Sequence, residues 1–209
     1  MIARDIRLAR ETGARLHIAH LSTADGVEMV RKAKMDGVRI TAEVSPHHFT
    51  LTDDAVSRYG ANAKMNPPLR SERDRAAVIE GLVDGTIDAI ATDHAPHAEY
   101  EKQWGLDQAP FGVVGLETAL GLTLGLVQQG RLTLQRAMTC LTSAPAAVLG
   151  LPRGTLEPGA AADVTLIDSD AFWTVDPERF RSKSRNTPFA GRVLKGQVVR
   201  TLVAGRTVY

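Results

Sequence analysis

The sequence has almost no cysteine, few aromatic residues and almost no net charge. Its single cysteine, Cys140, excludes a disulfide framework or a Cys-x-x-Cys metal site within the chain, and suits a reducing cytoplasm. The 25 basic and 24 acidic side chains give a net charge of +1, which provides no overall field for nucleic acid. No apolar run indicates a membrane span, and the charged segment 1–10 is unlike a signal peptide. We therefore expect a cytoplasmic protein with a small-molecule partner, rather than nucleic acid or membrane.

Motifs of two large enzyme classes are also missing. The sequence has no glycine-rich nucleotide-binding motif and no Gly-x-Ser-x-Gly motif, which argues against nucleotide binding and serine hydrolysis. All six histidines, in contrast, lie before residue 98, so the first half of the chain holds the polar residues of a candidate site. They are His17, His20, His47, His48, His94 and His97.

Residues 1 to about 130 alternate between helical and strand patterns. We predict helices over 1–12, from Ser22 or Thr23 to Asp36, and from Ser71 to Leu82, with strands over 16–20, 38–44 and 87–92. Such alternation implies parallel strands with right-handed crossovers, in a barrel or a doubly wound sheet. Three strands are too few to close either one.

The rest of the chain has a different pattern. Segments 46–70 and 94–112 are predicted as long ordered loops, followed by helices over 113–129, 132–141 and 144–149. Glycine and proline then become frequent, and short strands are predicted over 163–167, 198–203 and 206–209. We divide the chain into residues 1–150, an α/β unit, and residues 151–209, a small β unit.

Candidate catalytic residues lie where predicted strands end, which is where α/β barrels place their chemistry. Asp93 follows an apolar strand and, beside a metal, could transfer a proton, although an aspartate there could also simply cap a turn. His20 ends the first strand and is a candidate ligand, or else a core histidine. Strand alternation sends His17 to the opposite face, so it is interpreted as structural. Pro96 separates His94 from His97, so these two side chains are expected to diverge.

Five ordered segments resemble the dihydroorotases of the amidohydrolase superfamily. They are His17-Ile18-Ala19-His20-Leu21-Ser22-Thr23, Thr41-Ala42-Glu43-Val44-Ser45-Pro46-His47-His48, Lys64-Met65-Asn66-Pro67-Pro68-Leu69-Arg70, Ala91-Thr92-Asp93-His94-Ala95-Pro96-His97 and Ala109-Pro110-Phe111-Gly112. The segment Asn186-Thr187-Pro188-Phe189 also fits this family. The related allantoinases and dihydropyrimidinases match these segments less well.

The resemblance implies a set of roles. It makes His20 a zinc ligand and Asp93 both a zinc ligand and the proton shuttle, in a centre of two Zn²⁺ ions. Asn66, His97 and the backbone at Phe111 and Gly112 correspond to substrate contacts, whereas His47 and His48, which could be ligands or loop anchors, receive no catalytic role. The implied reaction is the reversible interconversion of N-carbamoyl-L-aspartate and L-dihydroorotate in pyrimidine biosynthesis.

Family members are longer and begin with a strand bearing His-x-His, which this sequence lacks. The resemblance therefore implies a C-terminal half: the last three strands of a (β/α)8 TIM barrel, followed by the C-terminal part of a β-sandwich. We expect the missing N-terminal half to be required for activity. The candidate protein partners are this half, another pyrimidine-pathway enzyme or a second copy of the chain. The alternatives are a non-catalytic remnant or scaffold, or a hydrolase of the allantoinase or dihydropyrimidinase type.

Overall fold

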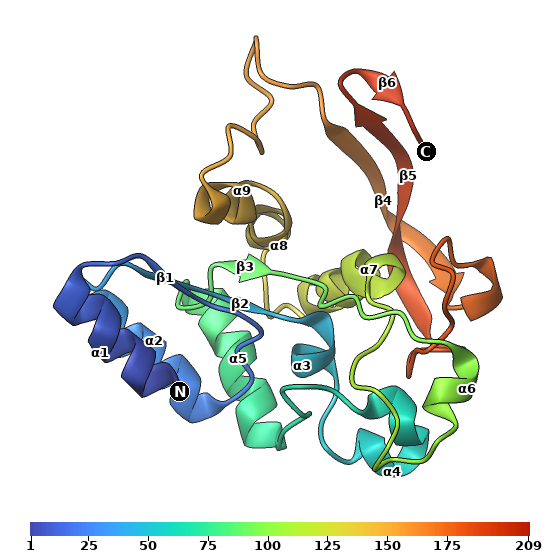
Figure 1. Cartoon of the computed structure of the whole chain (residues 1–209). Helices are drawn as coiled ribbons and strands as arrows, with labels where there is room; N and C mark the ends of the chain where they lie inside the picture. Colours follow the sequence, from blue (N-terminus) through green and yellow to red (C-terminus); the bar gives the residue numbers. More distant parts are fainter.

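The computed structural model describes all residues, 1–209, and contains two separate sheets. The first sheet has three parallel strands in the order β1-β2-β3, with α1, α2 and α5 along one side (Figure 1). In β2 the buried residues Ile40, Ala42 and Val44 alternate with Thr41 and Glu43, as expected for a strand with one face on a core. The elements of this part are α1 (Ile2–Thr12), β1 (Leu16–Ile18), α2 (Ala24–Met35), β2 (Ile40–Val44), α5 (Glu72–Asp84) and β3 (Ala89–Ile90).

Local capping fixes the ends of these helices, as predicted. Thr23 accepts a hydrogen bond from the Gly26 N–H at the start of α2, and Ser71 accepts one from the Asp74 N–H at the start of α5. Gly13 and Gly85 end α1 and α5 with φ of 69° and 84°, a left-handed conformation that glycine adopts without a steric cost.

The two segments predicted as long loops contain short helices, which corrects that prediction. Residues 46–70 form α3 (Pro46–Thr50), α4 (Ala55–Tyr59) and the 3-10 helix η1 (Gly60–Ala63), and residues 94–112 include α6 (Glu99–Lys102). Proline is favourable in the first turn of a helix, so Pro46 starts α3 rather than preventing it. A second small apolar cluster holds these segments together; it consists of Ala55, Ala63, Met65, Leu69 and Val113.

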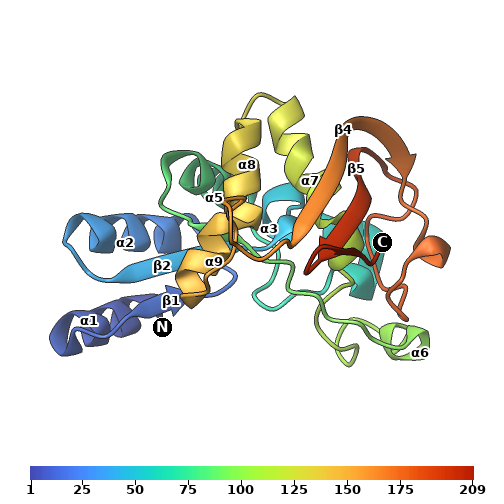
Figure 2. The same ribbon diagram turned by 90° about the horizontal axis from the view of Figure 1, so that it is seen from above.

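The second sheet is antiparallel, in the order β4-β5-β6, and lies beside α7 (Figure 2). Its two long strands are longer than predicted because irregularities in their register let pairing continue past Asp168. At this point the Asp168 carboxylate accepts hydrogen bonds from the N–H groups of Asp170 and Ala171. There is one sheet here, so the β-sandwich stays a prediction. The elements are α7 (Leu116–Gln128), α8 (Leu134–Leu141), α9 (Ser143–Leu149), β4 (Val164–Thr174), η2 (Pro177–Arg179), β5 (Val193–Val203) and β6 (Arg206–Thr207).

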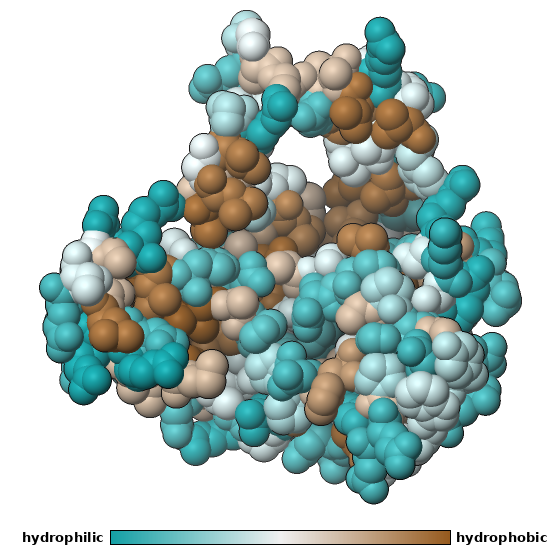
Figure 3. All heavy atoms as spheres, viewed as in Figure 1, coloured by the Kyte–Doolittle hydropathy of each residue, from teal (hydrophilic) through white to brown (hydrophobic).

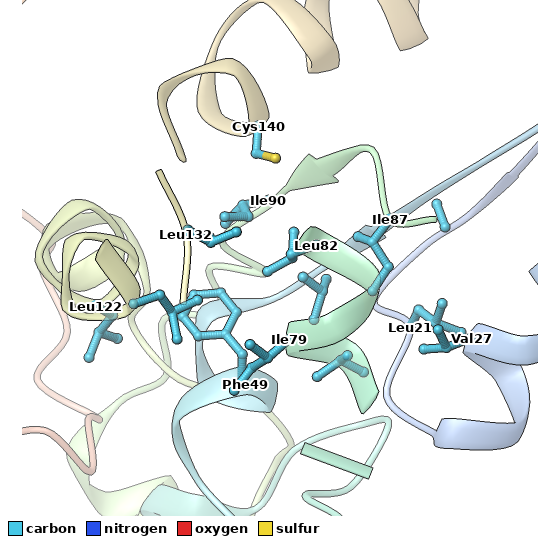
Figure 4. Packing of buried hydrophobic residues seen from close by; sticks show 14 of the residues in the cluster. Leu21, Val27, Phe49, Ile79, Leu82, Ile87, Ile90, Leu122, Leu132 and Cys140 are labelled. Atoms are coloured by element: carbon cyan, nitrogen blue, oxygen red, sulfur yellow. The ribbon is translucent and has the colours of Figure 1, made fainter. Parts of the chain in front are cut away.

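One hydrophobic core crosses the predicted boundary at residue 150. Figure 4 shows its centre, where Phe49, Ile79 and Leu132 pack together. Residues of the C-terminal segment, including Phe189 and Leu194, belong to the same cluster. The segments before and after residue 150 therefore share one apolar core, and the division between them stays a prediction.

Glycine allows β5 to approach α7 closely. A Cβ at Gly121 would lie 2.9 Å from Leu194 Cδ1, and a Cβ at Gly196, where φ is +99°, would lie 2.1 Å from Leu124 Cδ1. Neither position has room for a side chain, so this packing fixes the C-terminal sheet against the α/β part.

Several large apolar side chains nevertheless remain exposed. Figure 3 shows hydrophobic surface on the arch formed by α9, the segment after it and the C-terminal sheet, where Leu149, Leu156 and Val199 are exposed. None of the helices is both long and apolar enough to cross a membrane.

Candidate active site

The candidate site is built from the turns that follow the three parallel strands. His20 follows β1 with φ of 38°, and Asp93 follows β3 with φ of 50°. Only one other non-glycine residue, Ala204, has a positive φ. Left-handed backbone at a non-glycine residue costs on the order of 1–3 kcal/mol and is concentrated at functional sites. The two residues predicted as metal ligands are thus the two strained residues of this sheet.

His47 is the side chain that faces Asp93. It lies in α3, directly after β2, and its Nε2 is 3.9 Å from Asp93 Oδ2. The His47 side chain is 2% exposed, and its Nε2 has no hydrogen-bond partner. A buried polar atom without a partner costs free energy unless a ligand satisfies it. His47 therefore behaves as a side chain that is missing a ligand.

Electrostatics keep the His47 ring neutral. Burial lowers its pKa well below the ordinary value, and the nearby His48 and His20 rings lower the pKa further. A neutral imidazole has a lone pair to give to a metal ion. His20, His47 and Asp93 thus each follow one of three neighbouring strands, but no group of three or more His, Cys, Asp or Glu side chains is arranged to hold a metal ion.

His48 has a different role. Its Nε2 contacts the Pro67 carbonyl oxygen at 2.9 Å and so must donate to it, which ties α3 to the Asn66–Arg70 segment. Burial lowers the pKa of His48 to about 4, and the hydrogen bond to Pro67 opposes this only partly. The sequence left His48 open as a ligand or a loop anchor, and the structure shows it as an anchor.

The buried His48 should make the fold sensitive to acid. Its pKa is about 4 in the folded chain against 6.5 for an ordinary histidine, so between these values the unfolded chain binds more protons and stability falls as pH falls. We expect about 3 kcal/mol of stability to be lost through this group between pH 6.5 and pH 4. Urea unfolding of wild type and His48→Gln at both pH values measures it. Because the His48 ring also lowers the pKa of His47, its removal should reduce the acid sensitivity from both groups, and an unchanged acid sensitivity in the variant would contradict the assignment.

His17 contacts the neighbouring strand, as its structural interpretation predicts. Its Nδ1 lies 2.8 Å from Thr41 Oγ1 and its Nε2 lies 3.1 Å from Glu43 Oε2. The reasoning behind that interpretation was wrong in one respect, because β1 ends at Ile18 rather than at His20. The left-handed backbone at His20, and not strand alternation, separates the two side chains.

His94 and His97 diverge, as predicted. His94 Nδ1 accepts the Gly115 N–H at the start of α7. His97 Nε2 lies 2.8 Å from the Phe111 carbonyl oxygen, so this nitrogen carries the proton and donates it. His97 Nδ1 is 3.9 Å from Glu101 Oε2.

The other predicted substrate contacts are Asn66, Phe111 and Gly112. Asn66 is exposed and makes no side-chain hydrogen bond, so its amide is available to a ligand. Phe111 is exposed, with Lys64 Nζ 4.5 Å from its ring centroid. Gly112 is buried and its N–H already donates to the Lys64 carbonyl oxygen, which leaves the Phe111 N–H as the unpaired backbone donor of this pair.

His47 is the residue that sequence reasoning left without a role. The position of His47 in the sequence indicates a possible ligand, because His47 follows a strand end in the same way as His20 and Asp93 do. This indication was obscured by the adjacent His48 and by the expectation of a loop after Pro46. The short helix α3 sends the two rings in different directions, with 58° between their planes.

Comparison with known proteins gives a consistent set of relatives. The sequence profile of the amidohydrolase family matches residues 1–208. A dihydroorotase from Pelotomaculum thermopropionicum is 63% identical over 209 residues, which are 100% of this chain and 49% of that protein. A dihydroorotase from Syntrophotalea carbinolica is 56% identical over 208 residues and is likewise 49% covered. The chain spans about half the length of the curated relatives it matches.

Solved structures with a similar fold include several hydantoinases. The L-hydantoinase (dihydropyrimidinase) from Arthrobacter aurescens superimposes with a TM-score of 0.94 at 35% identity, covering 99% of this chain and 47% of that one. A D-hydantoinase from Thermus sp. gives a TM-score of 0.92 at 26% identity with the same coverage. The α/β fold of this chain is thus shared with these hydantoinases.

Proposed function

Because the chain belongs to the amidohydrolase family, a family of enzymes, we propose that it supplies part of the active site of a metal-dependent cyclic amide hydrolase, specifically a dihydroorotase. The observation that carries this proposal is that His20, His47 and Asp93 each follow one of three adjacent parallel strands, with His47 Nε2 3.9 Å from Asp93 Oδ2. Imidazole and carboxylate are the donor types that Zn²⁺ prefers. Conversion of N-carbamoyl-L-aspartate to L-dihydroorotate would place the protein in pyrimidine biosynthesis.

The residue types present are ones that bind zinc, although the side chains of this chain alone are not arranged as a group of three that could hold the ion. The buried, unpartnered Nε2 of His47 faces the Asp93 carboxylate, and His20 lies close enough to lower the pKa of His47. His20, His47 and Asp93 would hold the metal, whose Lewis acidity activates water and polarises a carbonyl group. Two Zn²⁺ ions need more donors than these three, and the remaining ligands would come from the N-terminal half that relatives contain.

Asp93 is suited to move the proton in this reaction. Hydrolysis of the ring adds water to the amide carbonyl carbon and breaks its bond to the ring nitrogen, which must gain a proton. The Asp93 side chain is 35% exposed, so a substrate can reach its carboxylate while it remains beside His47. Its oxygens can accept the proton of the attacking water and deliver it to the leaving nitrogen.

Substrate binding would use the residues around His97. With Nε2 donating to the Phe111 carbonyl oxygen, His97 has only Nδ1 left for a ligand; this nitrogen lies 3.9 Å from Glu101 Oε2 and would donate to a substrate carboxylate only in the imidazolium form. The exposed amide of Asn66 and the unpaired Phe111 N–H offer further donors. Dihydroorotate, which carries a carboxylate, matches this donor-rich surface.

A hydantoinase-type activity on an uncharged ring is the second candidate. The TM-score of 0.94 with the Arthrobacter aurescens L-hydantoinase favours it, whereas the 63% identity to a dihydroorotase favours an acidic substrate. Sequence identity reports on side chains at the site, while a superposition of backbones reports on the fold. We therefore place dihydroorotase first.

The architecture proposed is the partial TIM barrel expected from the sequence, completed by the other half of the enzyme. The parallel sheet has only three strands, with β1 and β3 at its two edges, and apolar side chains such as Leu156 and Val199 remain exposed on the C-terminal arch. An N-terminal half would continue the sheet beyond β1 and cover this arch as the rest of the sandwich.

The experiment compares this chain alone with the chain combined with the N-terminal half of the Pelotomaculum thermopropionicum dihydroorotase. We expect no dihydroorotate turnover above buffer from the chain alone in zinc, and turnover with bound zinc after combination. Turnover by the chain alone would show that the other half is not required. Zinc binding without turnover would favour a non-catalytic scaffold, and faster hydrolysis of dihydrouracil than of dihydroorotate would favour a hydantoinase-type enzyme.

A further inference from the structure

Asn186, which belongs to the C-terminal segment, lies between the two loops that carry the proposed substrate contacts. Its side chain is buried, and its Nδ2 donates to the carbonyl oxygens of Ala95 at 3.0 Å and Gly112 at 3.2 Å. Its Oδ1 accepts the N–H of His97 at 3.2 Å. One amide group therefore joins the Asp93–His97 turn to the Phe111–Gly112 turn.

The orientation of this amide is fixed by its partners. Carbonyl oxygens only accept hydrogen bonds, so the atom that faces Ala95 and Gly112 has to be the nitrogen, and the atom that faces the His97 N–H has to be the oxygen. A carboxylate of the same shape would lose both donors. The main chain of Asn186 adds a third link, because its carbonyl oxygen accepts the Val114 N–H.

The Gly112 turn is held from other sides as well. Lys102 Nζ donates to the carbonyl oxygens of Gly112 and Pro110 at 3.0 and 2.8 Å. The Gly112 N–H donates to the Lys64 carbonyl oxygen at 2.8 Å. Both lysines belong to the α/β part of the chain, so Asn186 is the side chain through which the C-terminal segment contributes to this turn.

We infer that Asn186 is a positioning residue that couples the C-terminal segment to the substrate loops by fixing His97 relative to Phe111. This inference rests on the proposed function for its consequence in catalysis. The contacts explain how it would act: His97 Nε2 donates to the Phe111 carbonyl oxygen, and Asn186 holds the backbone on both sides of that bond. Loss of the amide would let the two loops separate without removing any metal ligand.

The first test is amide hydrogen exchange on this chain, which needs no activity. Asn186→Asp keeps an acceptor for the His97 N–H and removes both donors, whereas Asn186→Ala removes all three side-chain bonds. We expect exchange at Ala95 and Gly112 to accelerate about tenfold or more in both variants, and exchange at His97 to accelerate more in Asn186→Ala. Amides of α2 and α5 should be unchanged.

Gln128→Glu is the matched control, because the Gln128 amide also joins the α/β part to the C-terminal sheet, through the Lys195 carbonyl oxygen at 3.3 Å, but away from the loops. It should leave exchange at Ala95 and Gly112 at the wild-type rate. Equal acceleration in this control, or loops that stay protected in both Asn186 variants, would overturn the inference. If Asn186→Asp fails to fold, Asn186→Ser, which retains one hydroxyl donor, should give an intermediate acceleration.

The second test uses the combined enzyme. Asn186→Asp should raise KM for dihydroorotate about tenfold or more with bound zinc unchanged, because the metal ligands are not touched. Unchanged KM together with loosened loops would refute the coupling to substrate. Absence of activity in the wild-type combination would instead count against the proposed function, while the exchange experiment would still decide whether Asn186 orders the loops.

Discussion

Replacing Asp93 by asparagine is expected to lower kcat of the combined enzyme by about 100-fold to 10,000-fold, the usual contribution of general acid–base catalysis. The amide keeps the shape of the carboxylate and loses its ability to accept a proton. Because Asp93 also faces His47 at 3.9 Å and is a proposed zinc ligand, kcat has to be expressed per bound zinc. Steady-state kinetics with metal analysis of the same samples measures both quantities.

Asp107→Asn is the control for loss of a nearby negative charge. Asp107 is exposed, and its carbonyl oxygen, rather than its carboxylate, accepts from Lys64 Nζ. This variant should retain wild-type kcat within about twofold, since exposed charges are well screened. An Asp93→Asn enzyme that keeps more than about a tenth of wild-type kcat per zinc would assign the proton transfer to another residue.

Gly112→Ala should produce the largest loss of stability among the site glycines. Gly112 has φ of +103°, and an added Cβ would lie 2.4 Å from the Ala95 Cβ. Backbone strain and overpacking each cost about 1–3 kcal/mol, so we expect the free energy of unfolding to fall by about 4 kcal/mol. Urea denaturation at pH 7 gives the value directly.

Gly105→Ala separates the two contributions. Gly105 lies in the same loop with φ of +83°, and an added Cβ meets nothing within 4 Å. Only the backbone cost, about 1 kcal/mol, is expected there. Similar losses in the two variants would mean that the Gly112 turn moves away from Ala95 and is not held by its surroundings.

The sequence by itself determined the elements whose causes are local. The caps at Thr23 and Ser71 and the terminating glycines at 13 and 85 involve residues close in sequence, so their positions could be predicted. The same reasoning placed His20 and Asp93 at strand ends. The strand predicted over 87–92 was too long, because only Ala89–Ile90 pair as β3. Apolar residues beside a strand show the same periodicity whether or not they pair, so the pattern does not mark where the strand ends.

Tertiary structure alone decided which of these residues meet. The contact between His47 and Asp93 depends on how α3 leaves β2, and the bonds of Asn186 to His97 and Ala95 span 89 and 91 residues. Periodicity and capping describe interactions within a few residues, so they carry no information about such pairs. The sequence specified the helices, strands and chemical groups of this site, and packing of the C-terminal segment against the α/β part determined their arrangement.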